Sequence, residues 1–365
     1  MQVDTMGGPR GGPRGMLPPI VVLHRNSSTW PTDSVCILDD PAFATSSALL
    51  RAVLSVQGIT ALTIMLVNAY TMAAIWPRRH RRSTQSTLFV LHLALADALV
   101  GVSMFVHIIF STSCFMANLA ATHESACLIP VVLGMFTWTL SATTLAAIAV
   151  DRYVCIMHSL RYYEFMNTRR VTTILCSLWV FSIFCACLYL PTWEWQEGRL
   201  CQEQNIVPVW HLVAVQMPLS VLVLGVVAVT HISIRQEARR SHARAKAAHG
   251  APWLVQSHSS ASIRSARIVI LVVGGFIMGD LPMKVFQVLL IVEDGSDNCS
   301  YWAFVALQIF SSLWYLVNPF IYAWKNASIR EDMTVLWTRL TARCKCSTVD
   351  QCMAGSRTPV GARRF

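Results

Sequence analysis

The chain has 365 residues, of which 54% are hydrophobic and only 13% are charged, and its formal net charge is +10. This composition is too apolar for a soluble globular protein. The positive charge would suit a nucleic-acid-binding protein, but the basic residues lie between hydrophobic runs and not along one face. We therefore predict a polytopic membrane protein, and we expect no nucleic-acid partner.

Residues 1–47 are rich in glycine and proline and contain no apolar run long enough to cross a membrane. The short apolar stretch 18–23 begins with two prolines and is too short for the core of a signal peptide. We expect a disordered tail here, and we expect the first membrane span to direct insertion.

Seven apolar runs of sufficient length follow the tail. They cover about 48–76, 86–112, 125–157, 171–191, 206–234, 266–292 and 301–324. A buried core helix could explain any one of them, but seven in succession with short polar joints indicate membrane spans. The predicted fold is an all-α membrane protein with a seven-transmembrane helix bundle over 48–324.

The charges of the joints predict the orientation of the bundle. The joints after the first, third and fifth runs carry Arg78, Arg79, Arg81, Arg82, Arg161, Arg169, Arg170, Arg235, Arg239, Arg240, Arg244 and Lys246. The opposite joints hold only Arg199 and several acids, so the positive-inside rule places the N-terminus outside and the C-terminus in the cytoplasm. Asn26 and Asn298 begin glycosylation sequons that would then face the glycosylating side.

In this orientation, two cysteines on the oxidising side lie where a disulfide could connect a loop to the helix bundle. Cys127 stands at the outer end of the third run, and Cys201 lies in the loop between the fourth and fifth. A disulfide between them would tie that loop over the bundle. Cys114 and Cys299 are also outside, so counting cysteines leaves other pairings open.

Nearly every run carries one or two residues that are characteristic of a known family, in the right order. They are Asn68, the stretch from Leu93 to Asp97, Cys127, the triplet from Asp151 to Tyr153, Trp179, Pro218, Phe276, Pro282 and the stretch from Asn318 to Tyr322. With these residues the chain resembles a rhodopsin-like (class A) G-protein-coupled receptor from about 48 to 346. The resemblance implies a plasma-membrane receptor, not an enzyme, without a cofactor. It would pass the signal of an extracellular ligand to a heterotrimeric G protein, with arrestin and receptor kinases as further partners.

The resemblance also assigns roles to two groups of residues. The activation switch that couples to the G protein would consist of Asp151, Arg152, Tyr153, Asn318, Pro319 and Tyr322. Activation would release Arg152 from Asp151 and swing Tyr322 inward. A polar network inside the membrane is expected among Asn68, Asp97, Ser141 and Asn318, because buried polar groups are costly there unless they are paired.

A ligand pocket can be carried over by position from the same family. Its candidate residues are Thr137, Trp138, Trp210, His211, Asp280, Met283, Lys284, Gln287 and Gln308. This lining is aromatic and amphipathic and has one cation, which suits a small acidic or amphipathic ligand or a peptide with a carboxylate. Gly134, where amine receptors carry an aspartate, disfavours an amine ligand, and Ser312, where opsins hold the retinal lysine, disfavours a photoreceptor.

The sixth run departs from the family pattern. It reads Gly279-Asp280-Leu281-Pro282 where the family usually has Cys-Trp-x-Pro, so an acid replaces the usual tryptophan switch. Lys284 follows one helical turn later, within reach of an ion pair with Asp280. The two charges could neutralise each other, or Lys284 could bind an acidic group of the ligand. Such departures point to high basal activity or atypical signalling.

The predicted cytoplasmic end, 325–365, begins with a segment of helical periodicity. Over about 326–341, one face carries Ile329, Met333, Leu336, Trp337 and Leu340. This pattern predicts an amphipathic helix on the membrane surface. Cys344 and Cys346 follow it and are candidates for palmitoylation, with free thiols as the alternative.

Two other functions are compatible with the apolar runs. A transporter or lipid-translocating protein could use Asp97, Asp280 and Lys284 as a polar relay, although the two halves of the chain show no internal repeat. A seven-helix scaffold could regulate partners without responding to a ligand.

Overall fold

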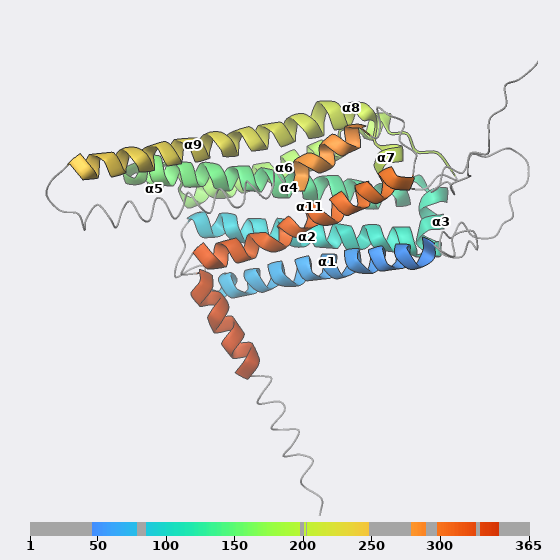
Figure 1. Ribbon diagram of the computed structural model, residues 1–365, viewed down its shortest axis with the longest axis horizontal. Helices are drawn as coiled ribbons and strands as arrows, with labels where there is room; N and C mark the ends of the chain where they lie inside the picture. The colour runs from blue at the N-terminus through green and yellow to red at the C-terminus, as the bar shows by residue number, and fades with distance from the viewer. Residues whose placement is uncertain are drawn as a thin grey trace, which may run out of the picture.

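The computed structural model describes residues 46–78, 85–197, 201, 203–247, 279–289, 298–325 and 329–342. In this part of the chain, six long helices run in roughly the same direction (Figure 1). They are α1 (Ser46–Ile75), α2 (Gln85–Thr112), α4 (Glu124–Met157), α6 (Thr168–Cys187), α9 (Met217–Ala247) and α11 (Asn298–Lys325). Each of the six contains a stretch long and apolar enough to cross a membrane.

The expected sixth span, 266–292, is described only over 279–289, and this segment is helical. Most bounds of the other helices lie within a few residues of the predicted spans. The clearest difference is at α9, which continues to Ala247 instead of ending near 234 and projects beyond its neighbours (Figure 1).

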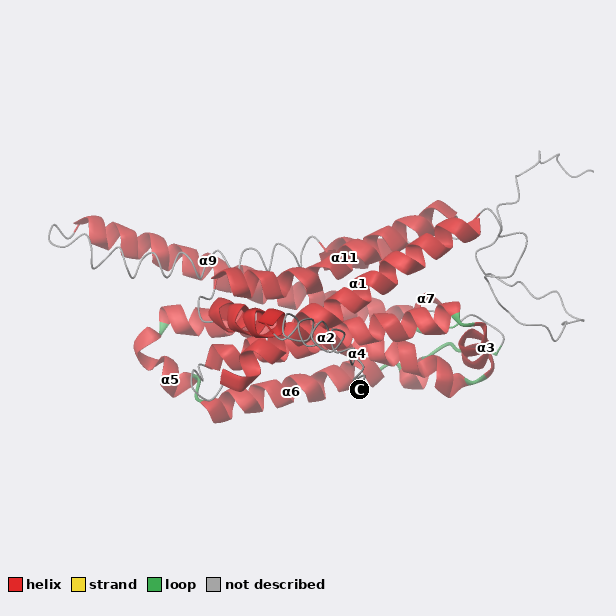
Figure 2. Cartoon of the chain, turned by 90° about the horizontal axis from the view of Figure 1, so that it is seen from below, coloured by secondary structure: helices red, strands yellow, loops and turns green. Residues whose placement is uncertain are grey.

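Short helical elements connect the long ones, and among the described residues there is no strand (Figure 2). They are η2 (Trp76–Arg78), α3 (Cys114–Thr122), η3 (Ser159–Arg161), α5 (Tyr162–Phe165), η4 (Leu190–Thr192), α7 (Glu203–Ile206), α8 (Val209–His211) and the π-helical turn η5 (Leu212–Gln216). Two of the helices have a side-chain N-cap. Asn167 accepts a hydrogen bond from the backbone N–H of Arg170 at the start of α6, and Ser113 accepts one from the backbone N–H of Met116 at the start of α3.

The helix α4 lies at the centre of the bundle. It contacts α2, α6 and α9, and 61% of its most apolar stretch is buried, against 22% for α6. Alanines on α4, among them Ala142 and Ala149, pack against Leu219 and Val223 of α9. Small side chains at these positions let the two helices approach closely, as is common between membrane helices.

The end of the bundle that is predicted to face the cytoplasm, which we call the inner end and its opposite the outer end, has its own apolar core. Ile75, Phe89, Leu93 and Tyr162 bring together the ends of α1, α2 and α5, and Ile329 joins them from the helical segment 329–342. The hydroxyl of Tyr70 on α1 donates to the carbonyl oxygen of Met333 at 2.6 Å. The helical segment 329–342 is inclined to the long helices (Figure 1) and lies where the sequence predicts the amphipathic helix. Its position on a membrane surface stays a prediction.

The outer end is closed by the disulfide Cys127–Cys201, so the structure selects this pairing from those that the sequence left open. Trp195 lies in the same loop as Cys201 and donates from its indole nitrogen to the carbonyl oxygen of Ala120 on α3 at 3.3 Å. Of the modification sites, Asn26, Cys344 and Cys346 lie outside the described residues, as does the side chain of Asn298.

Candidate functional site

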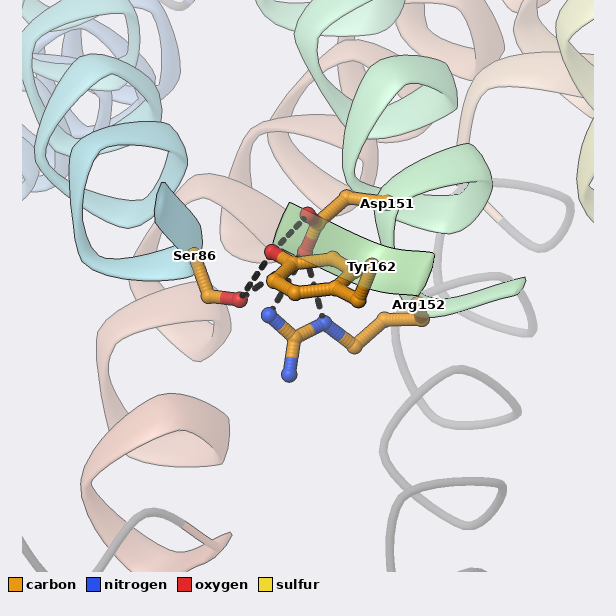
Figure 3. Close-up of polar contacts among 4 residues, drawn as sticks. All are labelled: Ser86, Asp151, Arg152 and Tyr162. Carbon is orange, nitrogen blue, oxygen red and sulfur yellow. Dashed lines mark hydrogen bonds and ion pairs between the residues drawn. The ribbon is translucent and has the colours of Figure 1, made fainter. Parts of the chain in front are cut away.

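The carboxylate of Asp151 organises the inner end of α4 (Figure 3). It is fully buried. Its Oδ2 accepts hydrogen bonds from Arg152, at 3.0 Å from Nε and 2.6 Å from Nη2, and from Ser86 Oγ at 3.0 Å. Its Oδ1 accepts from the hydroxyl of Tyr162 at 2.7 Å. Four donors thus compensate the buried charge and hold Arg152 against its neighbour in the chain.

Tyr162 reaches Asp151 because the turn η3 and the short helix α5 bring the chain back under α4. Burial, and secondarily the hydrogen bond to Asp151, raise the pKa of Tyr162 above its ordinary value. The hydroxyl therefore stays protonated at neutral pH and donates to the carboxylate. Together, Ser86, Asp151, Arg152 and Tyr162 form what we call the Asp151 cluster.

A second polar group lies deeper in the bundle and joins α2, α4 and α11. Ser141 Oγ donates to Asp97 Oδ1 at 2.6 Å, and Asn318 Nδ2 donates to Asp97 Oδ2 at 2.9 Å. Asn68 does not bind Asp97 but donates to the carbonyl oxygens of Ile64 and Tyr315. Three of the four residues expected in the network are thus hydrogen-bonded to one another, and Asn68 is attached to α11 through the backbone.

A cavity of about 20 Å³, enough for one water molecule, adjoins this group. Its polar lining comes from Ser141, Asp280, Ser311, Trp314, Tyr315 and Asn318. Trp314 packs closely on the segment 279–289, since a Cβ atom added at Gly279 would lie 2.3 Å from Trp314 Cδ1. A side chain at 279 would therefore displace the indole of Trp314.

The third polar group surrounds the two charges of the segment 279–289. Asp280 Oδ1 accepts from the indole nitrogen of Trp138 at 2.7 Å, and Asp280 Oδ2 accepts from Ser220 Oγ at 3.0 Å. Lys284 Nζ donates to Gln216 Oε1 and lies 4.6 Å from the centre of the Trp138 ring. These five residues, which we call the Trp138 cluster, connect the segment to α4, η5 and α9.

The direct ion pair that the sequence suggested between Asp280 and Lys284 is not formed. Both side chains are described, and their printed polar partners are Trp138, Ser220 and Gln216. The one-turn spacing brings the charges to one face of the helix, but the tertiary contacts of Trp138 and α9 take precedence over it.

The other pocket candidates differ in their surroundings. His211 is buried; its Nε2 lies 3.1 Å from the carbonyl oxygen of Cys185, and its Nδ1 lies 3.4 Å from Gln216 Nε2. Gln287 and Met283 are also buried, and Gln287 Oε1 has no hydrogen-bond partner in the described part of the chain. Trp210 is 40% exposed and donates to Thr192.

Two further candidates are engaged by neighbouring polar groups. The hydroxyl of Thr137 donates to the carbonyl oxygens of Leu133 and Gly134 on its own helix. Gln308 accepts from Gln57 at 3.3 Å, which connects α11 to α1.

Comparison with protein families decides the class of the chain. Residues 67–322 match the model of the family described as 7 transmembrane receptor (rhodopsin family). The chain belongs to the rhodopsin-like receptor family. It is a G-protein-coupled receptor, and the predicted seven-transmembrane bundle is confirmed. The match supports the receptor over the transporter that the sequence left open.

Individual relatives of this rhodopsin-like receptor are distant. It is 25% identical to the horse (Equus caballus) adenosine receptor A2a over 291 residues, 74% of this chain and 68% of the relative. The human (Homo sapiens) adenosine receptor A2a is 24% identical over 299 residues, 76% of this chain and 70% of the relative. The mouse (Mus musculus) G-protein coupled receptor 3 is 26% identical over 276 residues, 74% of this chain and 76% of the relative.

Sequence reasoning missed several residues that complete these clusters in the receptor. Ser86 and Tyr162 bind Asp151, and Gln216 and Ser220 bind the two charges of the segment 279–289. The sequence offered a weak signal for Gln216 and Ser220, which are polar residues inside the apolar run 206–234. Of the expected switch residues, Tyr153 lies beside His158, and the side chain of Tyr322 lies outside the described part of the structure.

A structural polar group that was also not predicted links α2, α4 and α6. The indole nitrogen of Trp179 donates to His92 Nε2 at 2.8 Å, and Thr144 Oγ1 lies 3.1 Å from His92 Nδ1. Within the described ranges, no three histidine, cysteine or acidic side chains gather in a way that could hold a metal ion.

Proposed function

We propose that this receptor lies in the plasma membrane with its N-terminus outside and responds to a small ligand with an acidic group. The acid binds beside Lys284, and the Asp151 cluster passes the response to a heterotrimeric G protein. Arrestin and receptor kinases belong to the same proposal, on the support of the family alone. The arginines of the alternate joints support the orientation.

The buried ammonium group of Lys284 carries the proposal on the ligand. Lys284 is only 7% exposed, and among the described residues its single hydrogen-bond partner is the neutral side chain of Gln216. An ammonium group has three N–H donors, so two of them have no hydrogen-bond acceptor among the described residues. A buried charge is costly unless an opposite charge meets it. The carboxylate of a ligand would supply that charge.

Gln287 narrows the chemistry of this ligand. It follows Lys284 by three residues, so the two side chains share one face of the helix. Gln287 is buried, and its free Oε1 can accept a hydrogen bond. A ligand that carries a hydroxyl or N–H group next to its acid would satisfy both residues. The supported class is therefore a small hydroxy acid or an acylated amino acid.

The Asp151 cluster supports the inner half of the mechanism. In the described arrangement, Arg152 is held by the fully buried carboxylate of Asp151 and cannot extend toward a G protein at the inner end of the bundle. A ligand that favours the arrangement in which Arg152 is free shifts the population toward it. The G protein binds that arrangement, so the two binding events favour each other.

The test uses a panel of small hydroxy acids and acylated amino acids, each paired with its methyl ester. Cells expressing the native receptor, Lys284→Gln or Arg161→Gln at matched surface levels are assayed for activation of each G-protein class. Arg161 is a matched control because it is an exposed cation that pairs only weakly, with Glu164 at 3.9 Å.

We expect at least one acid to activate the native receptor and the Arg161→Gln control, with no response to its ester. Lys284→Gln should lose that response. Equal activation by acid and ester, or an undiminished response of Lys284→Gln, would contradict the proposed ligand class. Neither result would change the assignment of this chain to the rhodopsin-like receptor family.

A further inference from the structure

Trp138 contacts both charges of the segment 279–289 with different parts of its indole ring. Its N–H edge donates to Asp280 Oδ1 at 2.7 Å, and its face lies 4.6 Å from Lys284 Nζ, within the range of a cation–π contact. Asp280 and Lys284 are 6% and 7% exposed. Each charge thus has one partner on α4 and one on the η5–α9 helix.

The same two charges have an alternative partner in each other. They are one helical turn apart with the acid on the N-terminal side, which is the favourable order for an ion pair on a helix. In a buried environment such a pair is stronger than in water. The chain therefore offers two ways to compensate the same charges, and only one of them ties the segment to its neighbours.

We infer that Trp138 is a positioning residue that keeps Asp280 and Lys284 apart, and that their direct pairing accompanies the active arrangement of the receptor. When the two charges pair, the segment 279–289 no longer needs Trp138, Ser220 or Gln216. It is then free to move against α4 and α9. These two sets of contacts exclude each other, so the segment is a two-state element.

This inference explains how the receptor works without a tryptophan at the position of Asp280. The indole that positions the segment 279–289 comes instead from Trp138 on α4, and it acts by keeping Asp280 and Lys284 apart. The inference concerns signalling without added ligand, when Asp280 takes the place beside Lys284 that the acid of the ligand is proposed to occupy. Its test uses no ligand, so its outcome is separate from that of the acidic ligand proposed above.

The decisive experiment is a double-mutant cycle between Trp138 and Lys284. Trp138→Phe removes the N–H donor but keeps an aromatic face, smaller than the indole, over Lys284. Lys284→Gln removes the possibility of an ion pair with Asp280. The native receptor, both single variants and the double variant are purified in nanodiscs, and basal nucleotide exchange is measured with each G-protein class.

We expect Trp138→Phe to raise the ratio of active to inactive receptor about tenfold, the usual effect of removing one hydrogen bond to a charged group. The same change in the Lys284→Gln background should have no such effect, because the charge pair cannot form there. Ser220→Ala, which removes the other donor to Asp280, should act in the same direction and with the same dependence on Lys284.

Trp179→Phe is the matched control. It also removes an indole N–H bond, to His92, but on a helix that does not touch the two charges. Its effect on basal exchange should be the same with and without Lys284.

Three results would overturn the inference. One is a rise in Trp138→Phe that persists in the Lys284→Gln background, which would show a packing role. The others are a fall in basal exchange and complete silence of Trp138→Phe and Ser220→Ala with every G-protein class. If Trp138→Phe fails to reach the surface, the Ser220→Ala cycle decides the question alone.

Discussion

Removing the hydroxyl of Tyr162 should raise the basal activity of the receptor. Tyr162→Phe deletes the only hydrogen bond to Asp151 Oδ1 among the described residues, while Arg152 and Ser86 still bind Oδ2. One oxygen of a fully buried carboxylate would then lack a donor. The arrangement that holds Arg152 is weakened, because Asp151 is then less well stabilised as an anion.

The structure sets the scale of this effect. A hydrogen bond to a charged group contributes about 1.5–3 kcal/mol, and each ~1.4 kcal/mol changes an equilibrium tenfold. We expect the bond only while Arg152 is held, so its loss should shift the ratio of held to free Arg152 by roughly ten- to a hundredfold. The melting temperature of the purified receptor should fall as well.

Basal nucleotide exchange in nanodiscs and thermal unfolding measure the two effects on one sample. Tyr163→Phe is the matched control, because Tyr163 neighbours Tyr162 in the chain but is 68% exposed and binds no carboxylate. If Tyr162→Phe and Tyr163→Phe behave alike in both assays, the Asp151 cluster does not restrain Arg152 and the reasoning is wrong.

Three further predictions rest on other contacts. Gly279→Ala should lower the melting temperature because the new methyl group would meet Trp314, and Trp314→Leu should restore part of the loss; a stable single variant would contradict the packing. His92→Leu should destabilise the receptor by about 1–3 kcal/mol, since the indole N–H of Trp179 loses its acceptor, whereas Thr172→Val on the exposed face of α6 should change unfolding little. The folded pKa of Tyr162 is raised above the unfolded value of about 10, so the stability from its hydroxyl is complete below pH ~10 and declines only above it. The difference in melting temperature between native and Tyr162→Phe should therefore be constant from pH 6 to 9, and a fall within that range would refute it.

Apolar periodicity and charge predicted the helices because both act over many residues. A span of some twenty apolar side chains is recognisable whatever its neighbours are, and arginines recur in every second joint between the spans. The bond between Asp97 and Asn318 was also predictable, because two polar groups at membrane depth have few alternatives to each other.

Contacts that depend on a helix rotation or on a turn could not be predicted in this way. The choice of Tyr162 over Tyr163 follows from the turn η3, and nothing in the two neighbouring tyrosines distinguishes them beforehand. Asp280 and Lys284 show the opposite problem. Their spacing correctly placed them on one face, but the partners supplied by Trp138, Ser220 and Gln216 come from other helices.

The unequal burial of α4 and α6 has a consequence for the tolerance of the receptor to sequence change. Protein neighbours surround α4 on several sides, so its side chains must fit fixed shapes, and even one added methyl group at Ala142 or Ala149 would meet α9. Only 22% of the apolar stretch that contains α6 is buried in the described structure, so its outward positions need only be apolar. Over evolutionary time α4 should therefore change slowly, while the outward face of α6 drifts freely among leucine, valine, isoleucine and phenylalanine.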